Sequence, residues 1–137
     1  MTGAKKIATL FYAAALYDAI LGLAFLFAAD WVFTAFWTEP PNHFGYVHFP
    51  AALLLVFALM FLAIARDPQQ NRNLILYGVL LKVSYCGVVF WHWWRGGIPY
   101  MWKPFAIFDL VFAVLFCVAY VALKKQEEEA DVVRRES

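Results

Sequence analysis

Four long apolar stretches constrain this chain more than any other feature of its sequence. They cover about residues 7–29, 48–65, 74–94 and 105–123. A helix that crosses a bilayer needs about 20 mainly apolar residues, within a range of about 17–25. In lipid each stretch has to be a helix, because a helix satisfies its own backbone hydrogen bonds without water. The sequence therefore predicts an all-α, integral membrane four-helix bundle over residues 1–123.

The composition agrees with a chain that is mostly in contact with lipid. Apolar residues make up 64% of the sequence and charged residues 15%. Soluble domains are typically about 45–50% apolar and about 25% charged, so the excess apolar surface needs a partner other than water. The lipid bilayer is the partner that this balance predicts. The net charge of +1 provides no broad basic surface, which argues against a nucleic-acid partner.

The segments between the stretches carry the residues that end helices. Pro40-Pro41 follows the first stretch, Arg66-Asp67-Pro68 the second and Gly96-Gly97 the third. Residues 124–137 form a charged tail that we expect to extend the last helix into water and then to fray. The first apolar run is about 23 residues long, against about 7–15 in a signal peptide, so we interpret it as a permanent span.

Lysine and arginine are distributed unequally between the two sides of the predicted bundle. The side with the two termini carries eight of the eleven: Lys5, Lys6, Arg66, Arg72, Lys124, Lys125, Arg134 and Arg135. The opposite side carries Arg95 and Lys103, and Lys82 lies within a span. Positive residues accumulate on the cytoplasmic side of membrane proteins, so we expect both termini, and hence the 124–137 tail, to be cytoplasmic.

Three charged residues lie inside the predicted spans: Asp18, Lys82 and Asp109. Each would cost about 2.5–3.5 kcal/mol at the centre of a bilayer on insertion scales. Asp18 and Lys82 are predicted at mid-membrane, and Asp109 lies roughly 8 Å further out at about 1.5 Å per residue. Lys82 could reach either carboxylate. One interpretation is a structural ion pair that orders the bundle, and the other is a proton-handling or ligand-binding group.

Helical spacing places these charges on stripes that could face one another. The stripes are Ala14, Asp18 and Gly22 on the first span; Lys82, Tyr85, Val89 and His92 on the third; and Asp109, Phe112, Phe116 and Tyr120 on the fourth. Small residues four apart allow helices to approach closely. We therefore predict an interior ligand-binding site formed by Asp18, Lys82, Tyr85 and Asp109.

The three histidines, His43, His48 and His92, all fall at the outer level of the predicted bundle. Histidine is the commonest metal ligand, so a transition-metal or haem site is an alternative. No HExxH motif supports it, and outer-interface histidines also serve as simple hydrogen-bonding groups. Cys86 and Cys117 lie in apolar stretches without a CxxC pair, and we interpret both as small buried hydrophobic residues.

A loose resemblance covers roughly residues 60–120. The run Ala65-Arg66-Asp67-Pro68, then Asn71-Arg72-Asn73, Gly78, Lys82 and Phe108-Asp109-Leu110 resembles small four-helix bacterial membrane proteins of the DoxX-like kind. The resemblance implies a multi-pass protein of the bacterial inner membrane. Some DoxX-like proteins are linked to quinone-coupled oxidoreductases as membrane subunits, and the likeness carries over no catalytic residue.

The leading functional hypothesis is a binding or accessory subunit for a hydrophobic ligand, such as a quinone or lipid, or for a partner membrane protein. Such a protein could form a homo-oligomer or join a larger membrane complex. The rival from another class is a membrane enzyme with a histidine-lined, metal-dependent site at the outer interface. A purely structural bundle that oligomerises through its aromatic surface is the third hypothesis.

Overall fold

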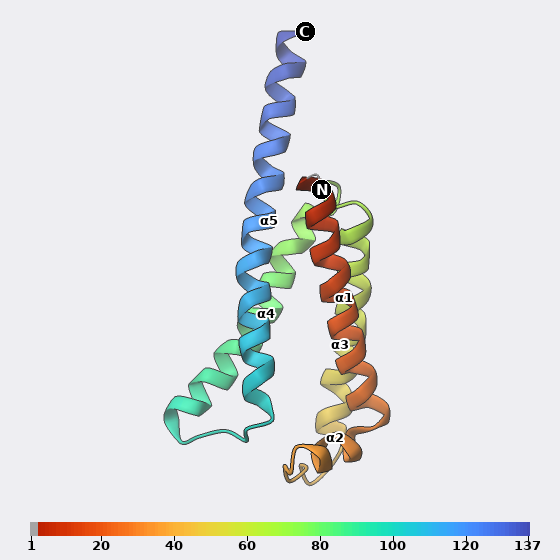
Figure 1. Cartoon of the computed structure of the whole chain (residues 1–137), viewed down its shortest axis with the longest axis vertical. Coiled ribbons are helices and arrows are strands. Elements are labelled where there is room, and N and C mark those ends of the chain that lie inside the picture. The colour runs from red at the N-terminus through yellow and green to blue at the C-terminus, as the bar shows by residue number, and fades with distance from the viewer. Residues whose placement is uncertain (1–2) are drawn as a thin grey trace.

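The computed structural model describes residues 3–137, which form five helices (Figure 1). These are α1 (Gly3–Phe27), α2 (Ala29–Ala35), α3 (Gly45–Arg66), α4 (Arg72–Arg95) and α5 (Trp102–Glu136). All but α2 are long and apolar enough to cross a membrane. The prediction of an all-α fold with four spans is confirmed, and the chain has the architecture of a multi-pass membrane protein.

The first connection differs from the loop expected there, because it contains the short helix α2. Its first turn is acidic, and Asp30 accepts a hydrogen bond from the backbone N–H of Trp31 at 2.9 Å. A carboxylate is favourable at this end of a helix, where backbone N–H groups lack partners. Val32 and Phe33 are buried and join Phe25 and Val47 in a small apolar core at this end of the molecule.

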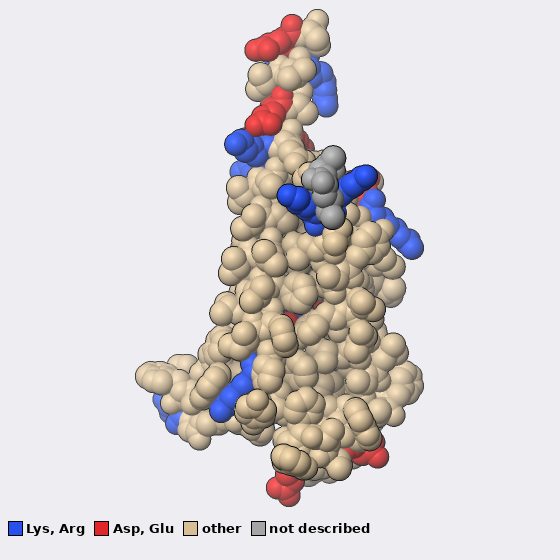
Figure 2. Space-filling model, viewed as in Figure 1, with Lys and Arg blue, Asp and Glu red and all other residues tan. Residues whose placement is uncertain are grey.

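The last helix is longer than the predicted span, as its charged tail suggested. It continues without a break to Glu136 and projects beyond the other helices (Figure 1). Within the tail, Arg134 pairs with Asp131 at 3.5 Å, and Glu127 pairs with Arg72 of α4. In Figure 2, charged side chains gather towards the two ends of the molecule and leave a mainly uncharged band between them.

The four long helices pack as two pairs. Along most of its length α1 lies against α3, and α4 lies against α5, while contacts between the pairs are sparse. At the end that carries the termini, all four helices join in an apolar core built around Phe11, Phe61 and Phe116. The rings of Phe11 and Phe116 stack with centroids 4.7 Å apart. The pairs are therefore held together at this end and are less closely packed at the other.

Two glycines lie at close helix contacts. A Cβ on Gly22 of α1 would lie 2.9 Å from the backbone oxygen of Ala51 in α3, and one on Gly78 of α4 would lie 2.7 Å from the Phe61 ring of α3. Ala14, Asp18 and Gly22 are all buried, as the small-residue spacing predicted. Small residues at such positions allow helix backbones to approach within van der Waals contact.

Candidate functional site

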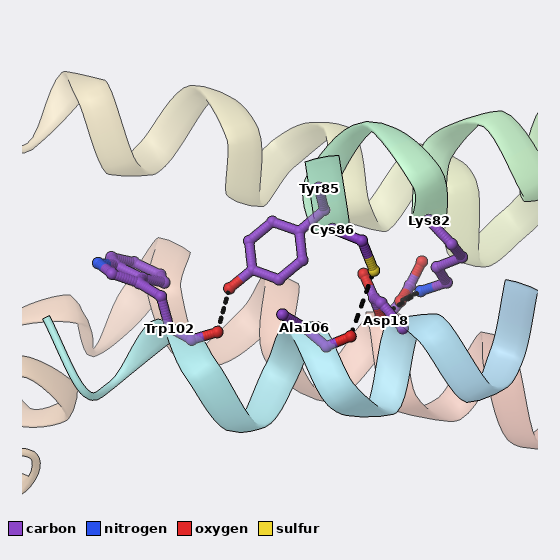
Figure 3. A network of polar contacts seen from close by, with 7 residues as sticks. Asp18, Lys82, Tyr85, Cys86, Trp102 and Ala106 are labelled. Atoms are coloured by element: carbon purple, nitrogen blue, oxygen red, sulfur yellow. Dashed lines mark hydrogen bonds and ion pairs between the residues drawn. The ribbon is translucent and has the colours of Figure 1, made fainter. Parts of the chain in front are cut away.

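The polar centre of the molecule is the side chain of Lys82, which lies between two carboxylates (Figure 3). Its Nζ is 2.7 Å from Oδ1 of Asp18 and 3.1 Å from Oδ1 of Asp109. These residues come from α4, α1 and α5, and their exposed fractions are 1%, 0% and 8% in that order. The prediction that the three intramembrane charges meet in the interior is confirmed. We refer to them below as the ion cluster.

Aromatic rings surround the ammonium group on its remaining sides. Lys82 Nζ lies 5.2 Å from the ring centroid of Tyr17, 5.4 Å from that of Phe112 and 5.6 Å from that of Phe61. A ring face attracts a cation within about 6 Å of its centroid. The lysine therefore has two charge-assisted hydrogen bonds and several ring contacts, which together compensate for its removal from water.

The charges of the ion cluster do not balance. One lysine faces two aspartates, so the cluster carries one excess negative charge when both carboxyls are ionised. Neutrality requires one further positive charge, either a proton on a carboxyl or a bound cation. An uncompensated charge at this depth is costly, and the cluster thus favours binding of a positive species.

Two polar atoms beside the lysine have no protein partner. Oδ2 of Asp18 and the hydroxyl oxygen of Tyr17 are buried without a hydrogen bond in the described chain. Buried polar groups in native structures are nearly always hydrogen-bonded, so each unsatisfied atom calls for an explanation. A ligand with a hydrogen-bond donor would satisfy the carboxylate oxygen.

A cavity of about 550 Å³ lies against the ion cluster, between the two helix pairs. All four long helices contribute to its wall, which is mainly apolar and includes Leu21, Leu54, Phe57, Leu81 and Phe105. Few of its lining residues have polar side chains: Asp18, Glu39, Asp109, Tyr17, Tyr46, Tyr85 and Trp102. Figure 2 shows acidic atoms recessed within the uncharged band, so the interior is visible from the lipid-facing side.

Tyr85 and Cys86 link α4 to the start of α5 (Figure 3). The Tyr85 hydroxyl donates to the backbone oxygen of Trp102 at 2.9 Å, and the Cys86 thiol donates to that of Ala106 at 3.2 Å. The sequence predicts Tyr85 in one site with the lysine. Tyr85 does line the cavity, but its hydroxyl is bonded to the neighbouring helix and not to Lys82.

The two cysteines differ in environment. Cys86 is buried as predicted, whereas Cys117 is exposed, so the prediction of a buried side chain was wrong there. Phe116 occupies the core, and the next residue in a helix points about 100° away, which turns Cys117 towards the lipid-facing surface.

The histidines all lie at the end of the molecule away from the termini, but each has a separate environment. His43 Nδ1 accepts a hydrogen bond from the N–H of Gly45 at 2.9 Å, the ring of His48 stacks on Phe44, and His92 is exposed near the end of α4. Within residues 3–137, no three His, Cys, Asp or Glu side chains are grouped so that they could hold a metal ion. The predicted histidine ligands are thus not brought together as a set.

Several cavity residues are not identified by the sequence as members of the site. Tyr17 has a usable signal, because it is a polar side chain next to Asp18 in an apolar span. Glu39 is a candidate carboxylate beside the outer histidines in the sequence, but nothing there places it at the interior site. Tyr46, at the start of α3, has no signal and reaches the cavity only through the fold. Trp102 is one of six tryptophans in the chain, and nothing in its sequence context distinguishes it as a member of the site.

Comparison of the chain with family models, with curated proteins and with solved structures finds no match.

Proposed function

We propose that this protein binds a hydrophobic ligand in the cavity beside the ion cluster and acts as a binding or accessory subunit in its membrane. The observation that carries the proposal is the position of the cavity, whose mainly apolar lining includes Asp18 and Asp109 of the ion cluster. A quinone or a lipid has the required form, with an apolar body and a polar group at one end.

The dimensions and lining support a ligand site. Small-molecule sites typically enclose about 300–1,000 Å³, with apolar walls and a few placed polar groups. The cavity of about 550 Å³ falls within that range and has this kind of lining. A cavity that results only from poor packing would not be expected beside Asp18 and Asp109, the residues whose burial in a span costs the most free energy.

Access from the bilayer follows from two residues that line the cavity and are also exposed. Tyr46 is 72% exposed and Leu53 is 40% exposed, and both belong to α3. The proposal therefore places the entrance of the cavity beside these two residues of α3. A ligand dissolved in the membrane could enter sideways without crossing water.

The cellular setting is part of the proposal. The loose resemblance to DoxX-like proteins supports a bacterial inner membrane. The bias of Lys and Arg towards the end that carries the termini supports a cytoplasmic location for both. In Figure 1 the two termini lie towards the same end of the bundle, which is compatible with that orientation.

Labelling of single introduced cysteines tests the orientation. Ile98→Cys lies between α4 and α5, and Gln70→Cys lies between α3 and α4. In a background with Cys86 and Cys117 replaced, a membrane-impermeant thiol reagent added to intact cells should modify position 98 and spare position 70. Permeabilised cells should show modification of both. The reverse pattern in intact cells would exclude cytoplasmic termini.

Native mass spectrometry of the protein in a mild detergent tests ligand binding. We expect a co-purified hydrophobic molecule, and we expect Leu54→Trp to remove it because the indole would fill the cavity that Leu54 lines. Leu59→Trp is the matched control, since Leu59 is on the same helix but is 68% exposed and does not line the cavity. Equal retention of the molecule by both variants would place it outside the cavity and contradict the proposal.

A further inference from the structure

The charged groups that line the cavity are all of one sign. Asp18, Asp109 and Glu39 contribute carboxyls, while no Lys, Arg or His of the described chain is among the lining residues. Lys82 is not among the lining residues, and its Nζ is bonded to both aspartates. The positive charges at the outer end are also directed elsewhere, because Arg95 lies over Trp91 and Lys103 over Trp93.

The field at the inner end of the cavity is therefore negative. When both carboxyls are ionised, Lys82 compensates one of the two aspartates and leaves one negative charge over. Low-dielectric surroundings strengthen the attraction of that charge for a cation and its repulsion of an anion. Asp18 Oδ2, buried and unpaired, is an acceptor of the kind that an N–H donor would satisfy.

The aromatic residues that line the cavity also favour a cation over an anion. Tyr17, Phe25, Phe57, Tyr85, Trp102 and Phe105 line the cavity, and the faces of such rings carry a partial negative charge that attracts cations. Aromatic side chains are a recurrent means of recognising quaternary ammonium groups.

We propose that the cavity selects a hydrophobic cation, namely a molecule with one ammonium or other onium group on an apolar body. The inference rests on the proposed function and names the chemical class of its ligand. The positive group neutralises the excess charge of the ion cluster, and the apolar body fills the space between the helix pairs. With a neutral ligand bound, only a proton on a carboxyl can compensate that charge, and an anion adds to it.

Three probes of similar shape and different charge test this selection on the purified full-length protein in detergent. Tetraphenylphosphonium is a cation, triphenylphosphine oxide is neutral, and tetraphenylborate is an anion. We expect equilibrium dialysis to show the cation binding about tenfold or more tighter than the neutral probe, and the anion binding weakest. Neutral and cationic probes of equal affinity, or a preference for the anion, would overturn the inference and leave the proposed function standing.

Asp109→Asn removes the excess charge and leaves Lys82 paired with Asp18. We expect the ratio of the affinity for the cation to the affinity for the neutral probe to fall towards one, while the neutral probe still binds. Glu128→Gln, in the exposed tail, makes the same change of charge away from the cavity and should leave the preference unaltered. If the Asp109→Asn variant binds none of the three probes, the order of the three affinities in the unmodified protein decides whether the inference stands. If no probe binds the unmodified protein and no molecule co-purifies with it, the proposed function itself fails.

Discussion

Replacement of Lys82 by methionine is expected to destabilise the protein more than any other single substitution in the ion cluster. The lysine is 1% exposed and pairs with two carboxylates, so its removal leaves both without a counter-charge in the interior. Removing one partner of a buried ion pair costs about 3–5 kcal/mol, because the remaining charge is uncompensated. The loss of stability is measured by thermal unfolding in detergent, monitored by the circular dichroism signal of the helices.

The loss should be partly reversed when the stranded carboxyls are removed as well. Lys82→Met combined with Asp18→Leu should be more stable than Lys82→Met alone, and adding Asp109→Leu should restore stability further. Groups in one ion network typically show coupling energies of about 0.5–3 kcal/mol. Strictly additive losses across these variants would mean that the three charges act independently, which contradicts a shared ion cluster.

Substitution of Gly22 by valine is expected to separate α1 from α3. Even the first carbon of a side chain would lie 2.8 Å from Cδ2 of Leu55 and 2.9 Å from the backbone oxygen of Ala51. Leu55 can rotate, but the backbone oxygen can move only with its helix. Overpacking of this kind costs about 1–3 kcal/mol, and the effect here should be at the upper end because the obstacle is backbone. Thermal unfolding in the same detergent provides the measurement.

Gly87→Val is the matched control for Gly22→Val. Gly87 also lies within a long helix, but a Cβ there would meet no other atom within 4 Å. Its stability should stay close to that of the unmodified protein. Comparable losses at the two positions would indicate a general intolerance of valine in these helices and would remove the close α1–α3 contact as the explanation.

Much of the fold could be predicted because lipid imposes strict demands on sequence. The apolar stretches identified the four spans, and the cost of intramembrane charge predicted that Asp18, Lys82 and Asp109 meet. That inference required only depth along each helix and the length of a lysine side chain. The structure shows which carboxylates Lys82 contacts: its ammonium group bonds to both Asp18 and Asp109.

The arrangement in two pairs and the cavity could not be predicted in the same way. Both depend on how far apart the helices lie, and that distance is decided by contacts such as Gly22 against Ala51, which join residues distant in the sequence. Tyr85 illustrates the same limit. Its position on the Lys82 stripe was predictable, but its hydrogen bond to Trp102 depends on where α5 begins. The three histidines lie at a similar depth along the bundle but do not form one site, because the sequence predicts depth along a helix and not position around the bundle.

The unequal packing of the two ends also gives the molecule a tapered outline. It is narrow where the four helices share the core around Phe11, Phe61 and Phe116, and broad where α2 and the far end of α4 spread outwards (Figures 1 and 2). A tapered body that spans a bilayer displaces more lipid from one leaflet than from the other. The leaflet on the side of α2 would give up the larger area per molecule, and we expect a change of lateral pressure there to alter the splayed end of α4 more than the packed end.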